Sequence, residues 1–293
     1  MSLFDELDSL HSDHKIDKRE IIKAPFGWVG GKSRCLDQIL PRLPYYKGWV
    51  DVFGGSGSVT LARKISPLEV YNDRHSGVTD FYKCLRDSKL CAELTERLQW
   101  YLHSREEWYN CHGTWDKVND PVDRAARWYY MIIYSFAKRG DAFGRSVYTV
   151  NATSGLHFTK TLTFMTLHER LKNVMIENLD FRQVFKDYSH PDTVFYCDPP
   201  YLNTLRTNYF GNAFNRKDHE DLLECIFKSQ SFVALSGHEN DLYDAYPWDN
   251  KFTWEQYRSI KCVDDSEGEE DADLKNKRDV AHKTEVLWIK ERK

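Results

Sequence analysis

The sequence lacks paired cysteines and long apolar runs. None of its seven cysteines stand as C-x-x-C, which argues against a zinc knuckle or a disulfide framework. No stretch approaches the roughly 18 apolar residues that a membrane span requires. Residues 1–20 are acidic and lack the basic and apolar regions of a signal peptide. These absences predict a soluble cytoplasmic protein with free thiols, no metal site and no membrane association.

An excess of basic residues is also missing. Lysine and arginine together number 41 against 45 aspartates and glutamates, which gives a formal net charge of -4. A uniformly basic nucleic-acid binder is therefore excluded, although a total charge hides local asymmetry. With 41% hydrophobic residues, the 293-residue chain can bury the core of one large domain or of two modest ones.

A phosphate-binding P-loop is absent despite a suggestive glycine-rich turn over residues 21–33. This turn ends in Gly-Gly-Lys-Ser, but a P-loop needs glycine five positions before Gly31, where the chain has Phe26. The alternative is a tight turn with a solvated lysine at Lys32. A short helix is predicted to follow over residues 34–43.

A second glycine turn has a stronger context. Residues 47–53 read as a strand that runs into Gly54-Gly55-Ser56-Gly57, followed by a helix over 58–65 and a strand over 68–71 that leads to Asp73. In such a unit the glycines allow close backbone approach to a nucleoside, and the acid accepts hydrogen bonds from the ribose. Because no pyrophosphate-binding loop is present, the pattern favours a nucleoside such as S-adenosylmethionine.

The tetrapeptide Asp198-Pro199-Pro200-Tyr201 follows a short apolar run, residues 194–197, that reads as a buried strand. The carboxylate therefore lies at the carboxyl end of a strand, where ligands bind in open α/β sheets. The two prolines stiffen the chain and leave its carbonyls as acceptors beside an aromatic ring. This arrangement suits a planar ring that bears an amino group, while the alternative is a plain turn after a strand.

The pattern between residues 75 and 167 is helical. One helix is predicted to start at the N-cap Asp120, with proline at the next position, and to run to about Phe136. A basic, glycine-broken loop follows, with cations at Lys138, Arg139 and Arg145. Such a loop could enter a DNA groove, and the alternative is a solvated loop. Tryptophans are predicted to be core residues at positions 100, 108, 115 and 128.

Further strands are predicted over residues 173–176 and 231–235. Helices are predicted from the opening residues 178–181 to about 188, and over 217–228. Residues 252–260 and 284–290 read as paired edge strands, and the charged segment between them, 264–278, as mobile. The predicted fold class is α/β, an open sheet with a helical insertion. The predicted divisions are a flexible tail (1–20), an α/β domain (21–81 and 166–293) and a helical domain (82–165).

Four motifs occur in a characteristic order: the turn from Trp28 to Lys32, the loop from Asp51 to Gly57, Asp73, and Asp198-Pro-Pro-Tyr201. In this order the chain resembles the Dam-type, D12 class, DNA N6-adenine methyltransferases from about residue 21 to its end. The resemblance implies a Rossmann-like methyltransferase sheet. It also implies that residues 21–81 and 166–293 form the catalytic domain and that the helical domain, 82–165, recognises the DNA target. The stretch from 134 to 150 departs from the family's recognition segment, so the resemblance does not specify a target sequence.

The resemblance implies a cofactor, a reaction and a set of site residues. The cofactor is S-adenosylmethionine, and the expected partner is duplex DNA. The reaction is expected to be site-specific transfer of the cofactor's methyl group to N6 of an adenine flipped out of the duplex into the site. The implied cofactor-binding residues are Trp28, Lys32, Phe53, Gly54, Gly55, Gly57, Asp73, Asp180, Phe181 and Asp198. The implied catalytic residues are Asp198, Pro199, Pro200 and Tyr201.

For DNA contact we expect Arg139 and Arg145 first, then Lys138, with Arg206 and Lys217 from the loop after the catalytic tetrapeptide. The protein is expected to be a monomer or weak dimer in a bacterial or phage-infected cell. Two alternatives stay open. The same site chemistry would suit an RNA or another amino-group acceptor, and a catalytically silent DNA-binding module could keep the fold.

Overall fold

The computed structural model describes residues 21–144, 158–202, 208–209, 212–257 and 282–293. The predicted tail (1–20) and the predicted mobile segment (264–278) lie outside the described residues, as does the recognition stretch from 145 onward. The described strands are β1 Gly48–Asp51, β2 Leu68–Asn72, β3 Val174–Glu177, β4 Thr193–Cys197, β5 Asn208–Tyr209, β6 Asn212–Ala213, β7 Phe232–His238, β8 Asn250–Tyr257 and β9 His282–Lys290.

The described α-helices are α2 Leu36–Ile39, α3 Ser58–Ala62, α4 Ser76–Arg86, α5 Ser88–Gln99, α6 Arg105–Thr114, α7 Pro121–Tyr134, α8 Phe158–Leu171, α9 Phe181–Tyr188, α10 Arg216–Lys228 and α11 Asp241–Asp244. Three 3-10 turns are η1 Lys32–Arg34, η2 Leu40–Arg42 and η3 Phe136–Lys138. The single helix predicted over 34–43 is thus divided among η1, α2 and η2.

Contacts divide the chain into two compact units. The described residues of Met1–Arg42, Gly55–Ile65 and Asp80–Asn173 form one, here called the helical unit. Those of Leu43–Gly54, Ser66–Thr79 and Val174–Lys293 form the other, the sheet unit. The domain boundaries expected from the sequence stay a prediction. The role of the helical domain in DNA recognition also stays a prediction.

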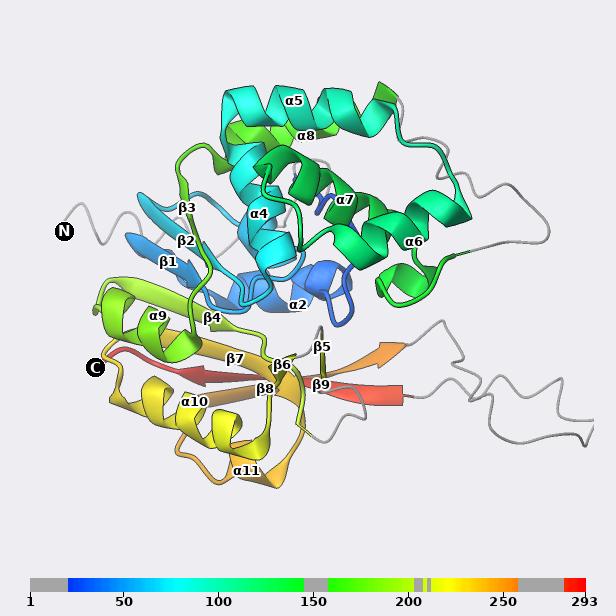
Figure 1. Cartoon of the computed structure of the whole chain (residues 1–293). Coiled ribbons are helices and arrows are strands. Elements are labelled where there is room, and N and C mark those ends of the chain that lie inside the picture. Colours follow the sequence, from blue (N-terminus) through cyan, green and yellow to red (C-terminus); the bar gives the residue numbers. More distant parts are fainter. Residues whose placement is uncertain (1–20, 145–157, 203–207, 210–211, 258–281) are drawn as a thin grey trace, which may run out of the picture. The chain divides into compact units, whose positions relative to one another are not determined.

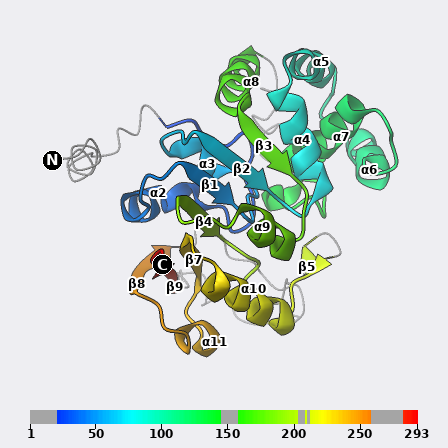
Figure 2. The same ribbon diagram turned by 90° about the vertical axis from the view of Figure 1, so that its left-hand side faces the viewer.

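The sheet unit contains a seven-stranded sheet of order β3-β2-β1-β4-β7-β9-β8. Strands β3, β2, β1, β4 and β7 are parallel to their neighbours, whereas β9 runs antiparallel to both β7 and β8. Figure 1 and the turned view in Figure 2 show these strands side by side. The α/β, Rossmann-like fold class predicted from the sequence is confirmed.

The strand order reverses between β1 and β4. From β1 the chain proceeds outward to β2 and β3, and then returns to β4 on the other side of β1. In open α/β sheets such a reversal opens a crevice at the carboxyl ends of the two strands, which is where ligands bind. The reversal therefore places the residues after β1 and after β4, including Asp198, at the edge where a ligand is expected.

One face of the sheet is covered by α9 and α10 (Figure 2). Apolar side chains of both helices pack on buried residues of the central strands, and the ring of Phe185 stacks on Phe195 at 4.4 Å between centroids. Both helices start where their caps require. Asp180 accepts the backbone N–H of Arg182, and Asn215 forms a capping box with Asp218. The polar caps fix the helix starts, and the apolar faces fix their position on the sheet.

The last two strands correct one detail. Strands β8 and β9 pair along their length as predicted, but only β8 is at the sheet edge, because β7 pairs with the other side of β9. Four consecutive residues of β9, from Val286 to Ile289, are accordingly buried. A strand that is buried on both faces has a continuous apolar run in its sequence, which is typical of an internal strand.

Buried His219 in α10 gives the sheet unit a dependence on pH. Its Nδ1 lies 2.6 Å from the hydroxyl of Tyr243, and burial lowers the pKa of its imidazole to about 4. The unfolded chain binds this proton near its ordinary pKa of about 6.5, so stability is lost as pH falls from there towards 4. We expect urea unfolding at pH 5 to give a free energy about 2 kcal/mol lower than at pH 7 through this residue. His219→Gln should remove that difference, and an unchanged pH slope would contradict the assignment.

In the helical unit, α7 is the central element. Its N-cap is Asp120, which accepts the backbone N–H of Asp123, and proline occupies the next position, as predicted. Ten residues of α7 between Val122 and Tyr134 are buried, and α7 contacts both α5 and α6. Phe26 inserts among the rings of Phe81 and Trp128. The predicted helical insertion between β2 and β3 is confirmed, since these two strands are neighbours in the sheet.

The tryptophan predictions were right in part. Trp108 and Trp128 are fully buried, and Trp115 is partly buried. Trp100 is 78% exposed, so its prediction as a core residue was wrong. It follows the last residue of α5, beyond the face that packs on α7 and α8, and so no neighbouring helix covers it among the described residues.

Candidate active site

Polar side chains gather at the carboxyl edge of the sheet. Asp73 follows β2, Asp180 lies beyond β3, Asp198 follows β4, and Ser236 is near the end of β7. Glu285 is near the start of β9, which runs in the opposite direction and so brings its early residues to the same edge. Parallel strands end at a common edge, and acidic groups from separate segments therefore lie along the edge that includes the reversal between β1 and β4.

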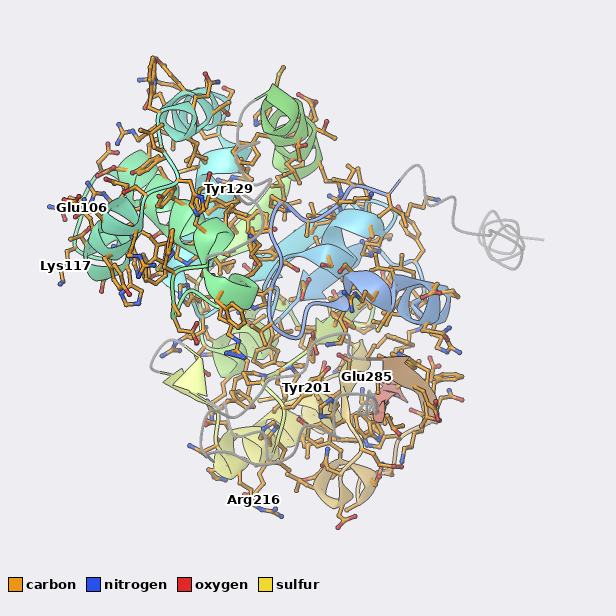
Figure 3. All side chains as sticks on the ribbon, turned by 90° about the vertical axis from the view of Figure 1, so that its right-hand side faces the viewer. Glu106, Lys117, Tyr129, Tyr201, Arg216 and Glu285 are labelled. Atoms are coloured by element: carbon orange, nitrogen blue, oxygen red, sulfur yellow. The ribbon has the colours of Figure 1, made fainter. Side chains whose placement is uncertain are left out.

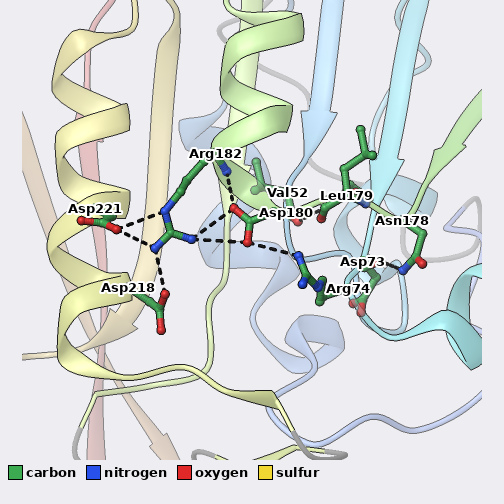
Figure 4. Close-up of polar contacts among 10 residues, drawn as sticks. Val52, Asp73, Arg74, Asn178, Leu179, Asp180, Arg182, Asp218 and Asp221 are labelled. Carbon is green, nitrogen blue, oxygen red and sulfur yellow. Dashed lines mark hydrogen bonds and ion pairs between the residues drawn. The ribbon is translucent and has the colours of Figure 1, made fainter.

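Asn72 joins the strands beneath this edge, and sequence reasoning gave it no role. Its side-chain amide donates to the carbonyls of Val52, at 2.8 Å, and Leu179, at 3.2 Å, while its oxygen accepts the N–H of Leu179 at 2.8 Å. The side chain is buried. The segments after β1 and β3 are thus held against the end of β2 (Figure 4).

Asp73 is held by a local turn. One carboxylate oxygen accepts the backbone N–H of His75 at 2.7 Å. The backbone carbonyl of Asp73 accepts the side-chain amide of Asn178 at 2.7 Å (Figure 4). The side chain is partly exposed at the edge of the sheet. A carboxylate in this position is an acceptor with a fixed direction, which suits two vicinal hydroxyls of a ribose.

Asp180 lies in a charged cluster that the sequence did not predict. Its two oxygens contact Arg182, at 3.1 Å, and Arg74, at 3.2 Å. The same Arg182 guanidinium contacts Asp218, at 2.8 Å, and Asp221, at 2.6 Å (Figure 4). Burial lowers the pKa of Arg182, but the three carboxylates raise it further, so the net shift is upward and the cation persists. Arg182 also lies over the ring of Phe181, 4.3 Å from its centroid.

The tetrapeptide is fixed by partners from two other strands. The hydroxyl of Ser236 donates to Asp198 Oδ1 at 2.7 Å, and the hydroxyl of Tyr196 lies 3.2 Å from the same serine oxygen. Tyr201 donates its hydroxyl to Glu285 at 2.8 Å, and these two side chains adjoin in Figure 3. Burial, with the carboxylates of Asp198 and Glu285, raises the pKa of Tyr201 well above its ordinary value. The phenol therefore keeps its proton at neutral pH and is the donor of the hydrogen bond to Glu285.

Neither Ser236 nor Glu285 was assigned a role from the sequence. A serine at the end of a predicted strand was the available signal for the first. Glu285 had a clearer one, because a carboxylate that interrupts an apolar strand has to find a partner when it is buried.

The glycine loop leaves little room at Gly54. A Cβ atom added there would lie 2.1 Å from the ring of Tyr71, so the chain can pass only without a side chain. The neighbouring Phe53 packs its ring against Phe181, at 5.9 Å, and Phe214, at 5.5 Å. The predicted loop residues of the sheet unit are thus tied to the segment that carries Asp180.

Gly54→Ala should lower the free energy of unfolding by about 1–3 kcal/mol, because Tyr71 is buried and has to move. Urea unfolding measures this loss. Gly113→Ala is the matched control, since Gly113 lies within α6 with nothing near its Cβ position. That change should stabilise the protein by about 0.5–1 kcal/mol through helix propensity. Equal effects of the two substitutions would contradict the packing argument.

The helical unit holds the other predicted cofactor residues, Trp28, Lys32, Gly55 and Gly57. Gly55 has φ of +51°, and a Cβ atom there would lie 2.7 Å from the indole of Trp28. Gly57 has φ of +67° and caps α3. Lys32 is only 4% exposed and donates to the carbonyl of Gly30 at 2.8 Å, so the solvated-lysine alternative is wrong. The backbone at Gly55 thus passes close to the Trp28 ring, and Gly57 begins α3.

The predicted DNA-binding residues differ in exposure. Lys138 is partly buried, has φ of +59° and donates to the carbonyl of Ile133 near the end of α7. Arg139 lies 5.9 Å from the ring centroid of Phe136 and 4.0 Å from Asp141. Lys217 is exposed on α10 and pairs with Asp221 at 2.8 Å. Arg145 and Arg206 lie outside the described residues.

Within the described ranges, no helix combines the length and apolar character needed to cross a membrane. Nor do histidines, cysteines and acidic residues come together there in a group of three that could hold a metal ion.

Comparison with known proteins gives several relatives of low identity. The chain is 27% identical to the type II methyltransferase M.FokI of Planomicrobium okeanokoites, over 84% of this chain and 41% of that protein. It is 26% identical to the DNA N-6-adenine-methyltransferase of Escherichia phage P1, over 85% of this chain and 34% of the relative. A DNA adenine methylase of Vibrio cholerae is 25% identical, over 72% of this chain and 80% of the relative.

The chain thus spans about two fifths or less of the first two relatives, and most of the third. The model of one family matches residues 28–269, which include the glycine loop, Asp73, Asp180 and the tetrapeptide at Asp198. The match covers every strand of the seven-stranded sheet except β9, which begins at His282. On this evidence the chain belongs to the D12 class N6 adenine-specific DNA methyltransferase family.

Proposed function

We propose that this protein transfers a methyl group from S-adenosylmethionine to N6 of an adenine flipped out of duplex DNA. The observation that carries the proposal is the position of Asp198, immediately after β4 at the point where the strand order reverses beside β1. Family membership supports the same reaction.

The hydrogen-bond acceptors and aromatic rings of the sheet unit suit this cofactor. Asp73 and Asp180 are acceptors at the ends of adjacent strands, which matches the ribose hydroxyls and the amino group of an adenine. Phe181 is the aromatic cover for the adenine, and Phe53 and Gly54 lie beneath the methionine portion. Trp28 and Lys32, with Gly55 and Gly57, hold the remaining part. When bound, S-adenosylmethionine supplies an electrophilic methyl group on a sulfonium.

Asp198 and Pro199 act on the target amino group. The N6 lone pair of adenine is delocalised into the ring, which makes the nitrogen a poor nucleophile. Two hydrogen bonds, one to the Asp198 carboxylate and one to the Pro199 carbonyl, favour a pyramidal nitrogen whose lone pair points at the methyl group. The nitrogen–carbon bond would form as the bond from the methyl carbon to the sulfonium sulfur breaks, with S-adenosylhomocysteine as the leaving group. Positive charge would develop on N6 in this step, so the carboxylate would stabilise the transition state more than the ground state. The methylated nitrogen would then lose one proton to water.

Pro200 stiffens the tetrapeptide, and Tyr201 stacks on the flipped base. The base cannot reach the crevice while it is paired in the duplex, so it leaves the stack and gains this aromatic contact instead. Ser236 holds the Asp198 carboxylate in place from β7. Because the flipped base would be held in line with the methyl donor, the reacting atoms would lose little further freedom in reaching the transition state.

Duplex DNA is the proposed partner, with cations from the segment after α7 and from the region around the start of α10. Arg139, Arg145 and Lys138 are the contacts proposed in the first. Arg206, from the segment before α10, and Lys217, in the first turn of α10, are those proposed in the second. The exposed Lys217 suits a phosphate contact. We further propose a cytoplasmic protein of a bacterial or phage-infected cell, acting as a monomer or weak dimer without metal.

The test is incubation with methyl-labelled S-adenosylmethionine and unmethylated genomic DNA, followed by digestion to nucleosides. Label in N6-methyladenine is the expected result. Parallel reactions with RNA and with protein distinguish other amino-group acceptors. Binding of the cofactor without label in any acceptor would overturn the proposal in favour of a silent binding module.

A further inference from the structure

Tyr201 is held at the far end of its ring by an acid from a different part of the chain. Its hydroxyl donates to Glu285 Oε2 at 2.8 Å, while Glu285 Oε1 lies 3.5 Å from Nε2 of His238. The His238 ring in turn packs against the Tyr201 ring, with 4.3 Å between centroids and 66° between planes. Three side chains from three segments thus form one cluster at the carboxyl edge of the sheet.

The sheet itself fixes two members of this cluster. His238 and Glu285 are register partners in the antiparallel pair of β7 and β9. They lie on neighbouring strands and their side chains emerge on one face, so neither depends on a loop for its position. The third member, Tyr201, lies three residues after Asp198 in the stiff tetrapeptide and is bound to this fixed pair.

A buried carboxylate at this position costs more free energy of folding than an apolar side chain that fills the same space. Glu285 is 4% exposed and is followed by four buried apolar residues, Val286 to Ile289. An apolar side chain would fill the site without the cost of removing a charge from water. Buried ionisable groups that contact each other beside a cleft are frequent at functional sites.

We propose that Glu285 is a positioning residue for methyl transfer, which acts on the flipped base through Tyr201 with His238 as its second partner. This inference rests on the proposed function. The hydrogen bond fixes the plane of the tyrosine ring and hence the angle of the base that stacks on it. The acceptor also keeps the ring electron-rich, which favours a base on which positive charge develops.

Four variants test the inference: Glu285→Ala, Glu285→Gln, Tyr201→Phe, and Tyr201→Phe combined with Glu285→Ala. Glu285→Ala should lower kcat by about 10- to 100-fold, since a small misplacement of the reacting atoms has effects of this size. The Kd for S-adenosylmethionine should stay within threefold. Glu285→Gln keeps an acceptor for the phenol and should recover part of the rate. The double variant should be no slower than the slower single variant, because both changes remove one interaction.

Glu291→Ala is the matched control, because Glu291 directly follows β9 and is exposed. It should leave kcat within twofold of the wild type. A thermal unfolding curve for each variant separates a lost fold from lost positioning. Should Glu285→Ala fail to fold, Tyr201→Phe still removes the same hydrogen bond and must by itself lower kcat.

Three results would overturn the inference: a full rate in Glu285→Ala, a full rate in Tyr201→Phe, or fully additive losses in the double variant. Failure of the proposed function would give a different experimental result. A wild type that labels no adenine in DNA refutes the function, whereas a wild type that labels DNA beside an equally active Glu285→Ala refutes this inference alone.

Discussion

Asp198→Ala should lower kcat for methyl transfer to DNA by about 1000-fold or more, with the fold intact. Removal of one group that stabilises developing charge costs roughly two to three orders of magnitude in well-ordered sites. In the proposed mechanism Asp198 also accepts a hydrogen bond from the amino group of adenine, so both effects would be lost together. The measurement is single-turnover methyl transfer at saturating DNA and S-adenosylmethionine.

The fold should survive this change because Asp198 is only partly buried, at the end of a strand whose backbone pairing is unaffected. Asp192→Ala is a matched control. Asp192 precedes the same strand at its opposite edge, where it lies 3.8 Å from Lys47. It should keep near wild-type turnover. Near wild-type turnover in Asp198→Ala itself would refute the catalytic assignment.

Asp73→Asn should raise the Kd for S-adenosylmethionine by about 10- to 100-fold, since a hydrogen bond to a charged group contributes about 1.5–3 kcal/mol. Asparagine keeps an oxygen that can accept the N–H of His75, so the turn after β2 is retained and only the charge is lost. Titration calorimetry with the cofactor alone measures the change without DNA.

Asp187→Asn is the control for charge, because Asp187 lies exposed on α9 and bonds only to Gln183 among the contacts described for it. Its Kd should match that of the wild type. If Asp73→Asn binds the cofactor within threefold of the wild type, Asp73 does not hold the ribose.

The glycines and the tetrapeptide could be found in the sequence because each is a local pattern. A strand of β-formers followed by Asp-Pro-Pro-Tyr specifies its own end, and Asp120-Pro121 specifies the start of α7. The periodicity of the residues around these points gave the element types and the α/β class, which the sheet confirms.

The partners of the site residues could not be found this way. Glu285 is 84 residues from Tyr201, and Leu179 is 107 residues from Asn72. Arg182 meets Asp218 and Asp221 only because α9 and α10 pack side by side. Local periodicity shows which face of an element is buried, but it does not show which distant element covers that face.

The sequence by itself determined the order of strands and helices, the ends at which the acidic residues stand, and the glycines that the backbone requires. Only the tertiary structure decided that β9 lies inside the sheet, that Lys32 is buried and Trp100 exposed, and that Ser236 and Glu285 hold the tetrapeptide. The reason is physical: element type follows from short-range sterics and periodicity, whereas burial and side-chain pairing depend on contacts between segments far apart in the chain.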